Sequence, residues 1–143
     1  MIVDDFQLKG KLKIEINDKV VAEVPNIVVN NGKDFVASRI KDATATVMSH
    51  MAIGTGTTSA VATDTTLETE LSGSRTALTS TTVSSNDIIY VATFAAGVGT
   101  GAVTEAGIFN ASSGGTMLCR TVFAVVNKAA ADAMTVTWTV TVS

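Results

Sequence analysis

The residues best suited to nucleophilic catalysis are few in this chain of 143 residues. It contains one His and one Cys, so a nucleophile–base pair would have to join His50 to Ser49, to a Thr or to Cys119. A lone histidine at the start of a buried segment is usually a packing or surface residue. Cys119 shares its predicted strand face with Met117 and Phe123, which favours a small buried hydrophobe over a reactive thiolate. The sequence therefore predicts no catalytic residue and a protein that is not an enzyme.

Metal and cofactor sites are disfavoured as well. One His and one Cys exclude a Cys/His zinc site within a single chain. Asp64, Glu68 and Glu70 do not follow the Asp-x-Asp-x-Asp spacing of a calcium loop, and we interpret them as solvated acids. The glycine-rich stretch 54–58 lacks the Gly-Lys-Ser/Thr ending of a phosphate-binding loop. We therefore expect no metal site and no cofactor.

Two charged residues lie in the middle of predicted strands in the charge-poor part of the chain. Glu105 falls within the predicted strand 103–110, and Arg120 falls within the predicted strand 117–126. Opposite charges on neighbouring strands form pairs that stabilise a sheet by about 0.2–1 kcal/mol. We therefore predict a cross-strand pair of Glu105 and Arg120, which would fix strand register if it were partly buried at a subunit contact.

Composition and charge exclude several classes of protein. Ten Lys and Arg against thirteen Asp and Glu give a net charge of −3, which argues against a nucleic-acid-binding surface. A single Pro and 46% hydrophobic residues argue against disorder. No apolar run approaches the roughly 18 residues of a membrane span. The first five residues lack the basic and apolar regions of a signal peptide, so we expect synthesis in a cytoplasm without export.

The charges are unevenly distributed along the chain. Residues 1–42 hold 14 of the 23 charged side chains, whereas residues 43–143 hold nine. The chain also contains 22 Thr and 19 Val, which are β-branched and favour strands. Because low charge is typical of surfaces that contact other proteins, the sequence favours a neutral, Thr-coated β protein that associates.

The N-terminal region has the pattern of a β-hairpin. Residues 8–16 alternate apolar and polar side chains, and residues 20–24 return after a turn at 17–19. Pro25 is expected to end the ladder or to mark an edge. A lysine-rich outer face commonly protects an edge strand. We expect this face to contact a partner, through the following side chains: Lys9, Lys11, Lys13 and Glu15.

Two helices are predicted. The first covers about residues 33–41, begins at Asn30-Asn31-Gly32 with Asn as the N-cap, and turns Phe35, Val36 and Ile40 towards the core. The second is short and covers Thr65–Leu71, with Asp64 as its N-cap.

The rest of the chain has the pattern of short strands separated by turns. Besides the hairpin, strands are predicted at 48–53, 75–83, 88–94, 103–110, 117–126 and 134–142. In the last of these, Val and Trp138 alternate with Thr. This pattern predicts a mostly β fold, namely a single antiparallel β-sandwich or a jelly-roll-like barrel with one short α-helix. We expect one domain overall, with residues 1–25 as an N-terminal hairpin extension and residues 26–143 as the sandwich body.

The sequence resembles small structural proteins of tailed bacteriophages over about residues 26–143. Asn30-Asn31-Gly32 opening a helix and a Thr/Val ending with Trp138 fit this family. Four further blocks carry the resemblance: 51–58 (MAIGTGTT), 64–71 (DTTLETEL), 103–111 (VTEAGIFNA) and 115–123 (GTMLCRTVF). The pattern consists of turn glycines and strand faces, so no functional residue is carried over from the family.

The resemblance implies a protein of the virion, made in the host cytoplasm. A tail fibre needs a long shaft, whereas a compact, charge-poor domain suits a capsid decoration (cement) protein that binds and stabilises the shell. The alternatives are a tail-fibre or baseplate component and a receptor- or glycan-binding module, for which Trp138 and Tyr90 are the candidate aromatics. The expected partners are the major capsid protein or other virion proteins, and copies of the same chain in a homo-oligomer, with a trimer favoured.

Overall fold

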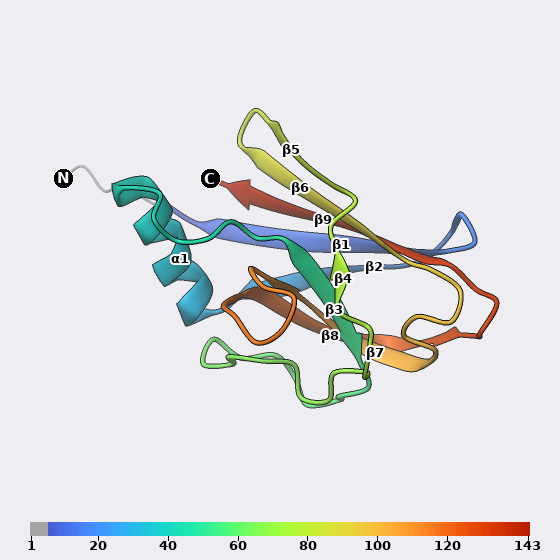
Figure 1. Cartoon of the computed structure of the whole chain (residues 1–143). Helices are drawn as coiled ribbons and strands as arrows, with labels where there is room; N and C mark the ends of the chain where they lie inside the picture. The colour runs from blue at the N-terminus through green and yellow to red at the C-terminus, as the bar shows by residue number, and fades with distance from the viewer. Residues whose placement is uncertain (1–5) are drawn as a thin grey trace.

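The computed structural model describes residues 6–143 as one antiparallel sheet and one helix (Figure 1). Residues 1–5, which belong to the expected 1–25 extension and to the stretch expected to lack a signal peptide, lie outside the described residues. The helix is α1 (Asn30–Lys41). The strands are β1 (Leu8–Ile16), β2 (Lys19–Val28), β3 (His50–Gly54), β4 (Thr76–Ala77), β5 (Ser80–Ser84), β6 (Asp87–Phe94), β7 (Gly101–Phe109), β8 (Met117–Lys128) and β9 (Met134–Val142).

The nine strands of the described region form one sheet in the order β4-β3-β7-β8-β2-β1-β9-β6-β5. All neighbouring pairs are antiparallel. The sheet curls, so that the half formed by β1, β9, β6 and β5 faces the half formed by β8, β7 and β3 (Figure 1). This mostly β, sandwich- or barrel-like fold with one short helix confirms the predicted fold class.

The N-terminal hairpin lies inside this sheet. β1 is flanked by β2 on one side and by β9 on the other, and it pairs with β9 from Leu8 opposite Val142 to Ile16 opposite Met134. The expected position of β1 at an edge is therefore wrong, and the hairpin is a central part of the sheet where an added extension was expected. Alternation reveals which face of a strand is buried, but it carries no information about which strands lie beside it.

Pro25 does not end β2. Residues 19–26 of β2 pair with β1, and the ladder to β8 begins only at Ile27 and Val28. Thr121 of β8 instead donates its hydroxyl to the Pro25 carbonyl (2.7 Å). At Pro25, β2 has no backbone hydrogen bonds to β8. A proline is tolerated at such a locally unpaired edge because it has no N–H to donate.

Helix α1 starts earlier than predicted and without a side-chain cap. Its N-cap is Val29, and no side-chain hydrogen bond caps it, so the predicted Asn cap is wrong. Gly32 is buried against the backbone of Leu118, where a Cβ atom would collide, and this lets the helix approach β8 closely. Phe35 and Val36 pack against the core, whereas Ile40 is 74% exposed, which contradicts its predicted inward orientation.

The predicted strand 75–83 is divided into two strands because the chain crosses between the two edges of the sheet. β4 pairs with β3 at one edge, and β5 pairs with β6 at the other. Only Leu78 and Thr79 separate them. The Leu78 N–H donates to the Ser49 carbonyl (2.9 Å), and the Thr79 N–H donates to the Val91 carbonyl (2.7 Å). This short crossing draws the two edges together.

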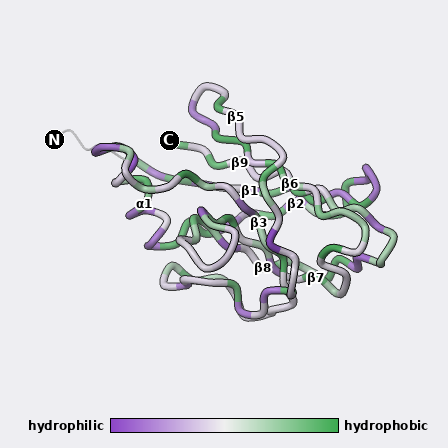
Figure 2. The backbone as a smooth tube through the Cα atoms, viewed as in Figure 1, coloured by the Kyte–Doolittle hydropathy of each residue, from purple (hydrophilic) through white to green (hydrophobic). Residues whose placement is uncertain are grey.

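The main core fills the inside of the curled sheet. Leu12, Ile14, Phe94 and Trp138 are among its fully buried side chains, and the Trp138 indole N–H donates to the Asn26 side-chain oxygen (2.8 Å). Figure 2 shows hydrophilic stretches on α1 and at the turn of the β1–β2 hairpin. A second, smaller cluster consists of Val29, Ala52, Leu67, Phe109 and Met117.

The second cluster belongs to the outer face of β3, β7 and β8, which is covered by residues 55–71. This segment, the 55–71 loop, follows β3 and contains no helix. The predicted helix at Thr65–Leu71 is therefore wrong. Leu67 of the loop packs over Gly107 of β7, and Leu71 donates its N–H to the Ile53 carbonyl (3.0 Å). The loop is the longest irregular segment of the described chain, and its polar contacts define the candidate site.

Candidate functional site

Glu105 and Arg120 lie together beneath the 55–71 loop. Glu105 is opposite Val122 in the β7–β8 ladder and Arg120 is opposite Gly107, so the two charged residues are diagonal neighbours on one face. Arg120 donates from Nε (3.0 Å) and from Nη2 (2.9 Å) to the same Glu105 oxygen, Oε2. Glu105 is 0% exposed and Arg120 is 2% exposed. The structure thus brings the two residues of the predicted pair into a buried ion pair within one chain.

The Glu105 carboxylate also accepts hydrogen bonds from the backbone of the loop. Its Oε1 accepts from the N–H groups of Gly56 (3.0 Å) and Thr69 (2.7 Å), and its Oε2 accepts from the N–H of Glu68 (3.0 Å). With the two bonds from Arg120, the carboxylate accepts five hydrogen bonds. In a helix at 65–71, the N–H groups of Glu68 and Thr69 would not be directed at Glu105. The segment stays a loop because a buried carboxylate needs these hydrogen-bond donors.

Arg120 also donates to the other half of the loop. Nη1 donates to Asp64 Oδ2 (2.8 Å), and Nη2 donates to the Thr58 carbonyl (3.0 Å). Burial by itself would lower the pKa of Arg120, but the hydrogen bonds and charges of Glu105 and Asp64 outweigh it and raise this pKa above its ordinary value. Arg120 therefore stays charged. Asp64 is an ion-pair partner of Arg120, so its predicted role as a helix N-cap is wrong. We refer to Asp64, Glu105 and Arg120 as the Glu105 cluster.

The glycines of the 54–58 stretch allow this close approach. A Cβ atom on Gly56 would lie 2.6 Å from Glu105 Oε1 and 2.6 Å from the Cβ of Glu68. A Cβ atom on Gly54 would collide with the Thr69 carbonyl and with the same carboxylate. These glycines are required because the backbone passes directly over a buried carboxylate, and phosphate binding is not needed to explain them.

A second arginine fastens the neighbouring loop. Arg75 donates from Nε (3.1 Å) and Nη2 (2.8 Å) to the two oxygens of Glu70, and from Nη1 to the carbonyls of Ala111 (2.9 Å) and Gly114 (3.1 Å). Its guanidinium lies 3.7 Å from the centre of the Phe109 ring, a favourable cation–π arrangement. Both arginines therefore donate to groups of the same chain, Arg75 to loop residues and Arg120 to Glu105 of β7 and to the 55–71 loop.

The other chemistry-bearing side chains do not assemble a reactive site in the described region. Ser49 Oγ and His50 Nδ1 lie 2.8 Å apart, but they are neighbours in sequence, and no acidic side chain contacts His50 among residues 6–143. Cys119 is fully buried, which raises the pKa of its thiol well above the ordinary value. Burial also raises the pKa of Tyr90 to about 12. Residues 6–143 contain no group of His, Cys, Asp and Glu side chains arranged to hold a metal ion.

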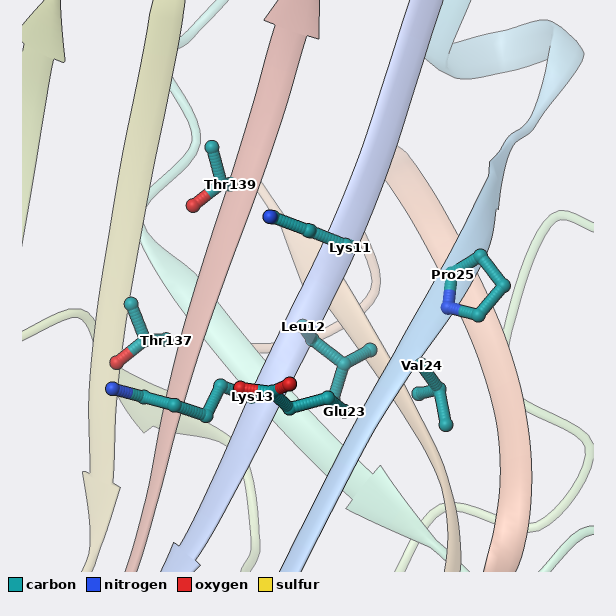
Figure 3. Close-up of a pocket in the computed structure, with 8 residues that line it drawn as sticks. All are labelled: Lys11, Leu12, Lys13, Glu23, Val24, Pro25, Thr137 and Thr139. Carbon is teal, nitrogen blue, oxygen red and sulfur yellow. The ribbon is translucent and has the colours of Figure 1, made fainter. Parts of the chain in front are cut away.

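The predicted partner-contact residues lie on a different part of the sheet. Lys9 and Lys11 are exposed on the outer face of β1, and Lys13 forms an ion pair with Glu15 (3.2 Å). Figure 3 shows Lys11 pointing from β1 towards β9 and Lys13 extending across β9 towards Thr137. A shallow groove of about 510 Å³ opens here, and its lining includes Lys11, Lys13, Glu23, Pro25, Thr137 and Thr139. We refer to the surface formed by these residues and Lys9 as the lysine face.

Sequence reasoning identified the charged pair but missed what surrounds it. Glu105 and Arg120 were recognisable because each is an isolated charge inside an apolar strand. Asp64 and the backbone donors at Gly56, Glu68 and Thr69 gave no separate signal, since a loop that folds over a carboxylate has no periodic pattern. The combination of two close glycines and a mid-strand carboxylate was the only signal that pointed to a buried anion.

Comparison of the chain with known protein families, with curated proteins and with solved structures gives no match. Within residues 6–143, no helix combines the length and the apolar character that crossing a bilayer requires. The function of the chain is therefore inferred from its own residues and their geometry.

Proposed function

We propose that the chain is a non-enzymatic structural protein of a tailed-bacteriophage particle, and that it decorates the capsid shell. One observation carries this proposal. The four sequence blocks that resemble phage structural proteins meet at the Glu105 cluster: the last three contribute Asp64, Glu105 and Arg120 in turn, and the first contributes Gly56, whose N–H donates to Glu105. The residues behind the resemblance thus fasten a loop onto a sheet, which is a scaffold role.

The bonding of the Glu105 cluster favours a non-catalytic protein. A general acid or base must come within hydrogen-bond reach of its substrate. Glu105 is fully buried and accepts five hydrogen bonds from its own chain, and Arg120 is committed to Glu105, Asp64 and Thr58. These charged groups are saturated by the fold and are withdrawn from the surface, so they support folding and leave recognition to other residues.

The surface favours attachment through several modest contacts. On β9, the threonines at 135, 137, 139 and 141 are partly exposed between buried Val and Trp side chains. Short, uncharged side chains bury at low cost in a protein contact, because no strongly hydrated group has to lose its water. On a shell that presents the same site many times, several weak contacts per copy act together.

The two candidate aromatic residues argue against the glycan-binding alternative. Trp138 is 0% exposed and Tyr90 is 7% exposed, so neither offers a ring face for a sugar to stack on. A tail-fibre or baseplate role has no comparable observation against it, and it is therefore the alternative that the test must separate.

The test is the copy number of the chain per particle. Purified virions would be analysed by quantitative mass spectrometry, with the major shell protein as the internal reference. We expect a ratio to the shell protein near one to one, or a fixed simple fraction of it. A few copies to a few dozen per particle would assign the chain to the tail, and its absence from the particle would overturn the virion role. A tail-tube protein measured in the same sample serves as the control for low-copy components.

A further inference from the structure

The lysine row of β1 needs an explanation other than edge protection. Lysines on an outer strand commonly prevent edge-to-edge pairing. β1 pairs with β9 from Leu8 to Ile16 and with β2 from Gly10 to Ile16, so Lys11 and Lys13 have strands on both sides, and only Leu8 and Lys9 lack a partner on β2. The edges of the described sheet are β4 (Thr76–Ala77) and β5 (Ser80–Ser84), and neither contains a charged residue. Lys11 and Lys13 therefore lie where protection of a strand edge does not require a lysine.

The neighbours of these lysines neutralise only part of the row. Lys13 has Glu15 at 3.2 Å and lies opposite Glu23 in the ladder with β2. Lys11 lies between Pro25 on β2 and Thr139 on β9, and Lys9 lies opposite Thr141. No acidic side chain of residues 6–143 forms an ion pair with Lys9 or Lys11. Alternate residues of a strand are about 7 Å apart, so these two ammonium groups form a local positive site.

The groove beside Lys11 has donors suited to a carboxylate. Lys11 points towards β9 on the side of Thr139, and Lys13 extends across β9 to Thr137 (Figure 3); both threonines line the same groove. An ammonium group and a neighbouring hydroxyl can donate to the two oxygens of one carboxylate. Pro25 closes the side of the groove towards β2 and contributes no N–H or charge of its own.

We propose that the lysine face binds a carboxylate-rich surface of another protein in the particle. This inference rests on the proposed function and specifies the face and the partner chemistry that it uses. Nucleic acid is the less suitable polyanion, because Glu15 and Glu23 interrupt the lysine row and the chain as a whole carries a net charge of −3. The contact should weaken as salt concentration rises, because exposed charges are screened.

The first test is zero-length carbodiimide cross-linking of intact purified virions, which joins a lysine amine to a carboxylate only where the two are in contact. Linked peptides would be identified by mass spectrometry. We expect Lys9 or Lys11 to be joined to an Asp or Glu of a different virion protein. Lys33, which is exposed on α1, is the matched control and should remain unlinked to other proteins.

The linked protein separates this inference from the proposed function. A link from Lys9 or Lys11 to the shell protein supports both, whereas a link to a tail protein supports the lysine face and overturns decoration of the shell. Links to other proteins from Lys33 alone would overturn the lysine face even if the copy number supports decoration. Absence of the chain from the particle overturns both.

A second test measures rebinding to particles produced without this protein. The full chain with Lys9→Glu and Lys11→Glu should bind at least about tenfold more weakly than the unmodified chain. The control carries Lys33→Glu and Lys41→Glu, an equal change of charge on α1, and should bind within about twofold of the unmodified chain. If both variants bind equally weakly, binding depends on the overall charge of the chain and not on the lysine face, and the proposal is overturned. Tight binding of the unmodified chain to duplex DNA, lost with Lys9→Glu and Lys11→Glu, would assign the face to nucleic acid instead.

Discussion

The outer surface of the sheet has two contrasting regions. Over β3, β7 and β8, the 55–71 loop covers the sheet, and the charged residues beneath it are saturated by hydrogen bonds within the chain. Over β1 and β9, no loop covers the lysine face, and Lys9 and Lys11 have no ion-pair partner among residues 6–143. Both regions contain charges and threonines, so composition alone does not distinguish them.

The two regions differ in whether the charged groups find their bonding partners within the chain. Loss of one partner of a buried ion pair leaves the other charge buried and uncompensated, which is strongly destabilising. An exposed charge with no partner in the chain contributes little to stability and remains available to another molecule. Substitutions in the first region should therefore unfold the protein, whereas those in the second should alter only binding.

The largest effect is expected at Glu105. Glu105→Ala leaves the Arg120 charge buried with only Asp64 opposite it, and should lower the free energy of unfolding by about 3–5 kcal/mol. Glu105→Gln keeps an acceptor for the loop and should fall between Ala and the unmodified chain. Urea denaturation measures both. Glu23→Ala removes an exposed carboxylate and should change stability by less than about 0.5 kcal/mol. If Glu105→Ala costs no more than this control, the cluster does not hold the fold.

A smaller loss is expected at Gly56. In Gly56→Ala the new methyl group would meet the Glu105 carboxylate, and overpacking of this kind costs about 1–3 kcal/mol. Gly114 has a φ of +60° with open space around it, so Gly114→Ala introduces only backbone strain, about 1 kcal/mol. Limited proteolysis should cut the 55–71 loop faster in Gly56→Ala alone. Equal cleavage of this loop in both variants would show that Gly56 does not control its position.

The covered region should also respond to acid. A hydrogen bond from the Thr58 side chain, followed by those from the N–H groups of Thr57 and Thr58, lowers the pKa of Glu68 below its ordinary value of 4.5. A lowered folded-state pKa adds stability that is present above the unfolded value and is lost as pH falls through the folded value. The urea midpoint should therefore decrease below pH 4.5, and less steeply in Glu68→Gln. Identical slopes in the two proteins would contradict a contribution from Glu68.

The smallest effect on stability is expected at the lysine face. The double variant Lys9→Ala and Lys11→Ala removes two exposed charges without an ion pair in the described chain, so its free energy of unfolding should stay within about 0.5 kcal/mol. Thermal and urea denaturation measure this change. A loss comparable to that of Glu105→Ala would mean that these lysines hold the fold, and the contrast between the two regions would disappear.

Local pattern was sufficient for most strands. Strict alternation predicted β1 and β9 with their observed bounds, because one face of each is buried in the core. It failed at 64–71, where an Asp followed by Leu67 and Leu71 resembles a capped helical turn. There the backbone is held by a carboxylate about forty residues away, and no local propensity encodes a bond of that range.

The candidate site was predictable only in part for the same reason. An isolated charge in an apolar strand implies a partner, which made Glu105 and Arg120 identifiable. Strand order, however, depends on pairings between distant segments, so the sequence did not show that β1 lies in the centre of the sheet. The lysine row was recognisable as a surface, but whether it protects an edge or contacts a partner depends on the position of β1 in the sheet.

The pairing of β1 with β9 has a consequence for the order of events during synthesis. β1 leaves the ribosome before the other strands described here, whereas β9 is made after all of them, and backbone bonds join even Gln7 to Ser143. Leu12 and Ile14 therefore have no complete core to enter until β9 has emerged. Folding dominated by such distant contacts is slow, on the order of milliseconds to seconds. Until then these residues stay uncovered in the nascent chain, and we expect the 14 charged side chains of residues 1–42 to help keep it soluble.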